Sequence, residues 1–346
     1  MGVYIQGIGN ISAQIFDPRS QDFTLHAGHG NRLICIEPDY KDMIPPMQLR
    51  RMSKIVRMGI ACAKAAMLDA GIVKPDTISL GTAYGCLADT EFFLQKLITQ
   101  DESMLTPTAF IQSTHNTVSG QIALLLNCTG HNFTYVHRGH SFETTLQEAF
   151  MLTQENVNCN ALIGGIDELT NNAFNIISRF RTYKKEDEHF NNEGKGCIAG
   201  EGANLFVVNA KDTKSSYAYC SDIHVCSTEN IAEELDGFLH VNQLQASDID
   251  TCLLGLNGDE RYDTIIANNI RNVKNTRTIS FKKYCGEYPS SGAFAMALAC
   301  KLLQSNTTPM NLQDLNAPLN DEPAQRVLIY NHYKNQYHSF ILLNRL

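Results

Sequence analysis

The chain has 346 residues, of which 43% are hydrophobic, and a formal net charge of -8 at pH 7. This length suits two domains of ordinary size or one large α/β unit with an internal duplication. A nucleic-acid partner would need a basic face, so the acidic balance argues against one. The chain contains no tryptophan, which excludes a tryptophan platform for sugars or bases.

The eleven cysteines do not predict a disulfide framework. Cys35, Cys62, Cys252 and Cys300 sit in apolar runs, no CxxC pair occurs, and no cysteine–histidine spacing matches a zinc site. We therefore expect reduced, mostly buried thiols, no metal, no cofactor and a cytoplasmic protein. The N-terminus lacks the features of a signal peptide, and no apolar run reaches the roughly 18 residues of a membrane span.

The first part of the chain predicts alternating strands and helices. An irregular stretch over 11–50 separates the first strand from the rest. The expected elements are a strand over 1–10, a helix over 53–72 that stops at Gly71, a strand over 77–85, helices over 88–99 and 119–130, a strand over 161–169, and a strand after the glycine-rich turns of 193–210.

A hydrophilic break after residue 211 opens a second half with the same order of elements. The expected elements are a strand over 218–226, a helix over 228–242, a strand over 252–256, a helix over 262–272, a strand over 277–281, a helix over 290–304 and a hairpin over 325–345. The alternation predicts an α/β fold, and the repetition predicts two pseudo-duplicated halves, residues 1–212 and 213–346.

The stretch TYVHRGHSFETTLQEAF, residues 134–150, is typical of the front of an active site. A β-prone run stops, and a helical pattern begins at once. Many α/β enzymes place a nucleophile where a strand turns sharply into a helix through a glycine. The tip here is Gly139-His140-Ser141, so the turn presents a histidine where a nucleophile is expected.

Five stretches in order resemble the β-ketoacyl synthase family, which has the thiolase fold. The resemblance rests on HNTVSGQIALLLNCTGHN, ALIGGIDELT, AGEGANLFVV, SFKKYCGEYPSSGAFAMALA and the C-terminal hairpin. It implies a thiolase-like fold with α-β-α-β-α layers in two pseudo-duplicated halves. Active members use a cysteine that holds the acyl chain as a thioester. Two histidines promote decarboxylation of the malonyl group and bind the developing enolate oxygen.

Carried onto this sequence, the resemblance implies that all three catalytic residues are replaced. The nucleophile falls on His140, the first histidine near Asn257 (to within one or two residues), and the second on Glu287. The lysine that orders one histidine remains as Lys282. Tyr333 stands roughly where the gatekeeper loop has a phenylalanine. The other expected pocket residues are Ser141 and Phe142.

Each replacement has a chemical consequence. Water readily cleaves an acyl-imidazole, so His140 would store an acyl chain poorly. An ionised Glu287 would repel the malonyl carboxylate and could not donate a hydrogen bond to an enolate. Asn257 can donate through its amide but cannot transfer protons. We therefore expect no Claisen condensation by this chain alone.

Three functions stay open. The first is a partner resembling a chain length factor, in a fatty-acid, polyketide or aryl polyene pathway, that pairs with an active ketosynthase or with itself and meets an acyl carrier protein. The second is a repurposed acyltransferase, thioesterase or decarboxylase that uses His140 and Glu287, with Ser141 as a further nucleophile. The third is a module that binds an acyl chain or a carrier protein without chemistry.

Each candidate residue also has a plain structural interpretation. His140 can fill the pocket or act as a base whose pKa Glu287 raises. Ser141 can bond the backbone at a helix start. Six further candidates have structural interpretations that we prefer: Cys285 and Cys86 in the core, His137 and Arg138 beside a dimer interface, and His26 and His29 without a third metal ligand. The run KKEDEH, residues 184–189, is expected as a solvated loop.

Overall fold

The ten long strands of the computed structural model repeat one topology twice. The structure describes residues 2–15, 17–20, 23–190, 194–270, 276–305 and 323–346. The first half supplies β1 (Val3–Ile11), β3 (Thr77–Gly81), β4 (Asn132–Tyr135), β5 (Ala161–Asp167) and β7 (Gly202–Asn209). The second supplies β8 (Ala218–Cys226), β9 (Thr251–Leu254), β10 (Arg277–Ser280), β11 (Arg326–Tyr333) and β12 (Tyr337–Asn344).

Both halves arrange their five strands in the same spatial order. The sheet runs β10-β9-β11-β12-β8-β1-β7-β5-β3-β4. When the five strands of each half are numbered in chain order, the second pairs in parallel with both the third and the fourth. The fifth pairs antiparallel with both the fourth and the first. The halves join where β1 pairs with β8, from Val3–Cys220 to Ile5–Ala218. The expected duplication is thus confirmed in the topology, whereas the boundary at residue 212 stays a prediction.

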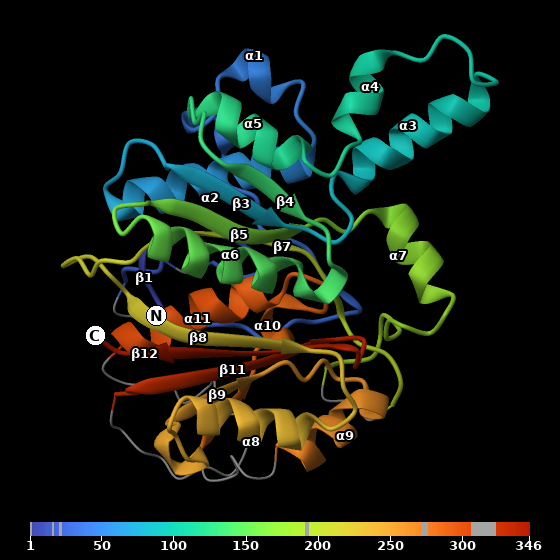
Figure 1. The fold of residues 1–346 in the computed structure, drawn as a ribbon. Coiled ribbons are helices and arrows are strands. Elements are labelled where there is room, and N and C mark those ends of the chain that lie inside the picture. Colours follow the sequence, from blue (N-terminus) through green and yellow to red (C-terminus); the bar gives the residue numbers. More distant parts are fainter. Residues whose placement is uncertain (1, 16, 21–22, 191–193, 271–275, 306–322) are drawn as a thin grey trace.

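We call the five strands of the first half the first arm of the sheet and those of the second half the second arm. Helices form three layers around these two arms (Figure 1). Those outside the first arm are α2 (Lys54–Ala70) and α5 (Thr117–Leu125), those between the arms are α6 (Ser141–Glu155) and α11 (Gly292–Gln304), and those outside the second arm are α8 (Ile231–Val241) and α9 (Glu260–Asn269). Each layer has its own apolar cluster of buried residues. The α-β-α-β-α layering expected from the sequence is therefore confirmed.

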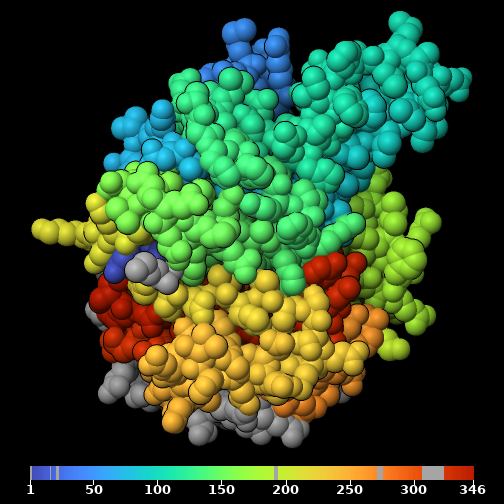
Figure 2. Space-filling model, in the orientation of Figure 1, coloured from blue at the N-terminus to red at the C-terminus, as the bar shows by residue number. Residues whose placement is uncertain are grey.

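The remaining elements are short, apart from α3. They are β2 (Arg32–Leu33) paired with β6 (Ala199–Gly200), α1 (Pro46–Leu49), α3 (Leu87–Thr99), α4 (Pro107–Gln112), α7 (Asn171–Ser178), α10 (Lys282–Cys285) and the helical turns Tyr40–Asp42, Arg138–His140 and Ala246–Asp248. Helices α3 and α4 project from the body (Figures 1 and 2). No helix in the described part of the chain is both long and apolar enough to cross a membrane.

The predicted elements agree with the observed ones except at their ends. The helix expected over 119–130 ends at Leu125, because Asn127 takes a left-handed backbone with φ of 52°. The strand expected over 77–85 ends at Gly81. The helix expected over 262–272 runs from Glu260 to Asn269, and residues 271–272 lie outside the described residues.

A buried carboxylate ties three segments of the first half together. Glu201 is fully buried between β6 and β7 and forms an ion pair with Lys54 of α2. Its Oε1 accepts the backbone N–H of Cys35 at 2.9 Å, and its Oε2 accepts that of Leu169 at 3.0 Å. The carboxylate thus joins an N-terminal loop, an outer helix and the turn after β5.

Replacing this carboxylate should destabilise the protein. Glu201→Ala leaves two backbone donors and a lysine without their acceptor, and we expect a loss of about 3 kcal/mol in the free energy of unfolding. Denaturant unfolding measures this loss. Glu155→Ala, at an exposed position, is the control and should change stability by less than about 0.5 kcal/mol. Equal effects of the two variants would contradict the proposed role.

Candidate active site

The strand-to-helix turn predicted from the sequence is present, and its strained residue is Arg138. Strand β4 ends at Tyr135, a short helical turn spans Arg138–His140, and α6 begins at Ser141. Arg138 has a φ of 57°, in the left-handed region that residues other than glycine rarely occupy. Such strain is typical of the nucleophile position in a sharp strand–helix turn. By its backbone the tip of this turn is therefore Arg138, two residues before His140.

Gly139 brings the C-terminal hairpin against the turn. A Cβ atom on this buried glycine would lie 2.5 Å from Cβ of Tyr333 and 2.7 Å from Cβ of Tyr337. Any side chain would push the hairpin away. The glycine therefore fixes the loop between β11 and β12, where the family's gatekeeper loop is expected, directly over the start of α6.

His140 contacts the C-terminal hairpin. Its Nε2 lies 3.1 Å from the carbonyl oxygen of His338, and its ring meets that of Tyr337 edge-on at 5.2 Å. Burial lowers the pKa of His140. The ring lines a shallow pocket beside β8, whereas Glu287 lines a different pocket. The structure thus does not bring together the His140–Glu287 pair that one hypothesis requires.

Two residues expected in the pocket are instead enclosed in the protein. Ser141 is fully buried, and its Oγ accepts the N–H of His137 at 2.9 Å while lying 2.8 Å from the carbonyl oxygen of Arg138. Phe142 is fully buried in the central apolar cluster. Neither side chain lines the pockets described here. The hydroxyl of Ser141 therefore has the helix-start role, not that of an accessible nucleophile.

Three other predicted residues do meet. Asn257, Lys282 and Glu287 are all buried. Asn257 Nδ2 donates to Glu287 Oε2 at 2.7 Å, and Lys282 Nζ lies 3.0 and 3.1 Å from the two carboxylate oxygens of Glu287. Lys282 Nζ also donates to the carbonyl oxygen of His332. We call Asn257, Lys282 and Glu287 the polar triad.

The polar triad satisfies its own charges. Burial raises the pKa of Glu287, and the charge of Lys282 and the Asn257 amide act in the opposite direction. A buried carboxylate persists in its charged form only with such partners. Because the amide and the ammonium both bond Glu287, they are engaged and not poised as donors for an enolate oxygen.

Two aspartates that the sequence reasoning missed, the buried Asp167 and the partly buried Asp263, hold the turns around the triad. Asp263 accepts the N–H groups of Asn257 and Gly258 at 3.0 and 2.8 Å, and burial raises its pKa to about 6. Asp167 accepts the N–H groups of Ala83 and Ser290 at 2.8 and 3.1 Å. Asp167 lies in the quoted stretch ALIGGIDELT, which was the available signal in the sequence.

Two members of the triad, Asn257 and Glu287, line a cavity of about 560 Å³. Helix α7, which the sequence reasoning missed, supplies an apolar wall. The lining includes Tyr84, Leu169, Ala173, Ile176, Ile177, Phe180, Tyr183, Asn257, Glu287 and Tyr333. The hydroxyls of Tyr84 and Tyr333 lie 3.3 Å apart, and the Arg138 guanidinium stacks over the Tyr84 ring at 4.9 Å. The cavity therefore combines an apolar wall with a polar end, which also includes Glu168, Asp259, Arg261 and Lys334.

No thiol in this cavity is prepared for attack. All eleven cysteines are free, and ten are buried. Cys197 lines the cavity, but burial raises its pKa well above the usual value, and its Sγ donates to the carbonyl oxygen of Thr182 at 3.2 Å. Burial likewise raises the pKa values of Cys86 and Cys285. A nucleophilic thiol needs the opposite shift.

Comparisons with known proteins agree with this architecture. Residues 35–214 match the family model of the β-ketoacyl synthase N-terminal domain. The chain belongs to the β-ketoacyl synthase family. Its whole length superposes on three solved structures. These are a β-ketoacyl synthase from Burkholderia phymatum (TM-score 0.79, 14% identity, 99% of that chain), a ketosynthase with its chain length factor from Xenorhabdus doucetiae (0.78, 16%, 98%), and a type II polyketide ketosynthase with its acyl-carrier protein, bound to the hexaketide (0.78, 12%, 99%).

At these identities the superpositions establish the fold of this family member and nothing finer. A search of curated proteins found no match.

The remaining candidates of the sequence analysis lie outside the cavity. The ring of His29 meets that of His189 edge-on at 5.9 Å, and His26 has a hydrogen bond through its backbone N–H to Gln14. The run KKEDEH is only partly the solvated loop we expected, because Lys184 is buried and its backbone N–H donates to the carbonyl oxygen of Cys197. This run therefore supports one wall of the cavity.

Breaking the polar triad should cost stability. Lys282→Met leaves Glu287 buried without its counter-charge, and we expect a loss of about 3 to 5 kcal/mol in the free energy of unfolding. Adding Glu287→Gln should recover most of that loss. The control, Lys41→Met, removes an exposed pair with Asp39 and should change stability by less than about 1 kcal/mol. Additive losses in the double variant would show that the two groups are uncoupled.

A second prediction concerns Glu143, in the first turn of α6. It is fully buried, one oxygen accepts from Ser339 Oγ at 3.0 Å, and the other has no partner among the residues that the structure describes. Burial raises its pKa to about 7. Because the folded pKa exceeds the unfolded value, this group's stabilisation is present below pH 4.5 and is lost as the pH rises through 7.

Glu143→Gln removes that titration. We expect the variant to be more stable than the parent at pH 8, by about 3 kcal/mol, with little difference at pH 4.5. Urea unfolding at several pH values measures the difference, and Glu155→Gln on the same helix is the control. A difference that does not grow with pH would contradict a raised pKa.

Proposed function

We propose that this protein is a non-condensing subunit, similar in role to a chain length factor, that pairs with an active ketosynthase in a fatty-acid, polyketide or aryl polyene pathway. One observation carries the proposal. The turn at Arg138 keeps the strained backbone and the helix of a nucleophile site, but no thiol lies there. A fold that keeps the backbone geometry of an active site without its nucleophile suits a partner subunit.

The chemistry of the cavity supports the same role. Condensation needs a thiolate and free donors for an enolate oxygen. The polar triad is self-paired, and the cavity thiol of Cys197 has a raised pKa. The apolar wall from α7 offers room for an acyl chain. The cavity can thus bind or limit a growing chain without forming bonds.

An exposed sheet edge supports pairing with a second chain. Strand β4 ends the sheet, and Phe133 on it is half exposed. Sheet edges present unpaired backbone groups and readily accept another strand. The ketosynthase from Xenorhabdus doucetiae, of similar fold, was solved in complex with its chain length factor, and the type II polyketide ketosynthase in complex with its acyl-carrier protein. We extend both kinds of partner, a ketosynthase and a carrier protein, to this chain.

A binding module without chemistry is the second candidate, and the same apolar cavity favours it. A repurposed enzyme is disfavoured, because His140 and Glu287 line different pockets and the Ser141 hydroxyl is buried. The two candidates differ in the partner they need. A subunit of a pair acts only with a ketosynthase, whereas a module binds acyl-carrier protein alone.

Co-expression with an intact ketosynthase encoded beside this chain tests the proposal. We expect a one-to-one complex by light scattering, and no carbon–carbon bond formation by the isolated chain with acyl- and malonyl-carrier protein. Phe133→Asp should abolish the complex because it places a charge on the sheet edge. Val73→Asp, at a position 93% exposed, should leave it intact.

Two results would overturn the proposal. One is condensation by the isolated chain. The other is a chain that stays alone or pairs with itself while an intact ketosynthase is present. Tight binding of acyl-carrier protein in that second case would favour the binding module.

A further inference from the structure

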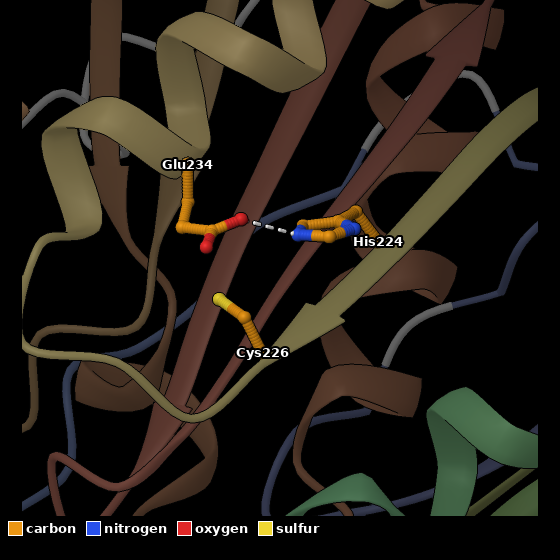
Figure 3. Close-up of side chains that lie close together, drawn as sticks. All are labelled: His224, Cys226 and Glu234. Atoms are coloured by element: carbon orange, nitrogen blue, oxygen red, sulfur yellow. Dashed lines mark hydrogen bonds and ion pairs between the residues drawn. The ribbon is translucent and has the colours of Figure 1, made fainter.

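Three metal-ligating side chains converge outside the candidate active site. His224 and Cys226 lie two residues apart near the end of β8, so their side chains share one face of the strand. Glu234 follows in α8 and points back at them (Figure 3). Their ligand atoms, one from each residue, all lie within 4.8 Å of one another. None of these residues lines the cavity of the polar triad.

The surroundings hold the three side chains in place. His224 Nε2 lies 2.7 Å from Glu234 Oε2. The imidazole is stacked with the rings of Phe238 and Phe340 at 6.3 Å each. The loop between β8 and α8 is short, so the strand and the helix that carry the cluster follow each other closely along the chain. The ring that would supply one ligand is thus already oriented.

The donor set matches a particular class of metal. An imidazole nitrogen, a thiolate sulfur and a carboxylate oxygen together suit Zn²⁺, which accepts all three ligand types. Ligands of a tetrahedral zinc ion lie roughly 3 to 4 Å apart, given bond lengths of about 2.0 to 2.3 Å. The observed spacing needs only a small rotation of side chains that are partly exposed. Soft metal ions that prefer thiolate ligands alone, and hard ions that prefer oxygen ligands, suit this set of three donor atoms less well.

Charge balance supports the same assignment. The thiolate of Cys226 and the carboxylate of Glu234 together offset the two positive charges of the ion. Metal binding replaces the thiol proton, which passes to solvent. A cation at this point relieves the repulsion that Glu234 exerts on the thiolate.

We propose that His224, Cys226 and Glu234 bind one zinc ion with three protein ligands and a fourth position open to water or to a side chain of a partner. The site is independent of the proposed function, since it lies on the outer face of the second arm of the sheet. The site is nevertheless linked to the strand–helix turn through His338. Cys226 pairs with His338 across β8 and β12, and the carbonyl of His338 meets the His140 ring.

Titration of the full-length chain with zinc, in competition with a chromophoric chelator, tests the proposal. The chain is first reduced and stripped with a chelator. We expect one equivalent of zinc and a rise in the unfolding temperature with zinc concentration. Cobalt should give a thiolate-to-metal charge-transfer band at the same stoichiometry. Cys226→Ser should remove the band, and Glu234→Gln, at a partly exposed position, should weaken zinc binding by more than about tenfold.

Matched variants separate this site from binding elsewhere. Cys128→Ser removes a buried thiol distant in sequence. His131→Gln removes the imidazole of another histidine–glutamate pair. In that pair His131 Nε2 lies 2.6 Å from Glu148 Oε1, which also accepts from the Tyr135 hydroxyl. Both variants should bind zinc as the parent does. The proposal is overturned if no cobalt–thiolate band forms, or if Cys226→Ser and Glu234→Gln, folded by circular dichroism, keep parental affinity.

Discussion

The fold depends on one buried layer of helices that two sheet arms share. Helix α11 has alanine or glycine at five of its first eight positions and is buried at every position but its last. Because α6 and α11 cover the inner faces of both arms, each half buries apolar surface against a helix of the other. The same sharing places the start of α6, from the first half, beside the hairpin of the second. The candidate site forms where the halves meet.

Within that frame, electrostatics sets what the site can do. Buried charges need partners, and here Lys282 and Glu287 partner each other with Asn257 as the third member. Such a pair fixes the local conformation and cancels its own charge. Neither of its two groups is free to exchange a proton or a hydrogen bond during a reaction. The cavity beside it is apolar on the α7 side. Binding is therefore the capability that its chemistry favours.

The sequence predicted the architecture well because hydrophobic periodicity and glycine stops are local signals. Gly71, for example, ends α2 with a left-handed backbone, as expected. The resemblance to the family, carried onto the sequence, implied that Glu287, Lys282 and a residue near Asn257 belong to one site. It did not predict the direction of the His140 ring, since packing against Tyr337 and His338 is a long-range contact. It also missed α7, a helix of eight residues, and the cluster on β8, because its ligand spacing matches no common motif.

The strained turn at Arg138 also constrains how this chain can evolve. A thiol restored at that position would gain the dipole of α6, but Lys282 would already be paired with Glu287. It could be acylated, yet Asn257 and Lys282 would still be bonded to Glu287 and not available to the next intermediate. An intermediate genotype of this kind would sequester acyl groups without turning them over. Under the proposed function, a return to condensing chemistry would thus require several simultaneous changes, which would favour continued dependence on a partner.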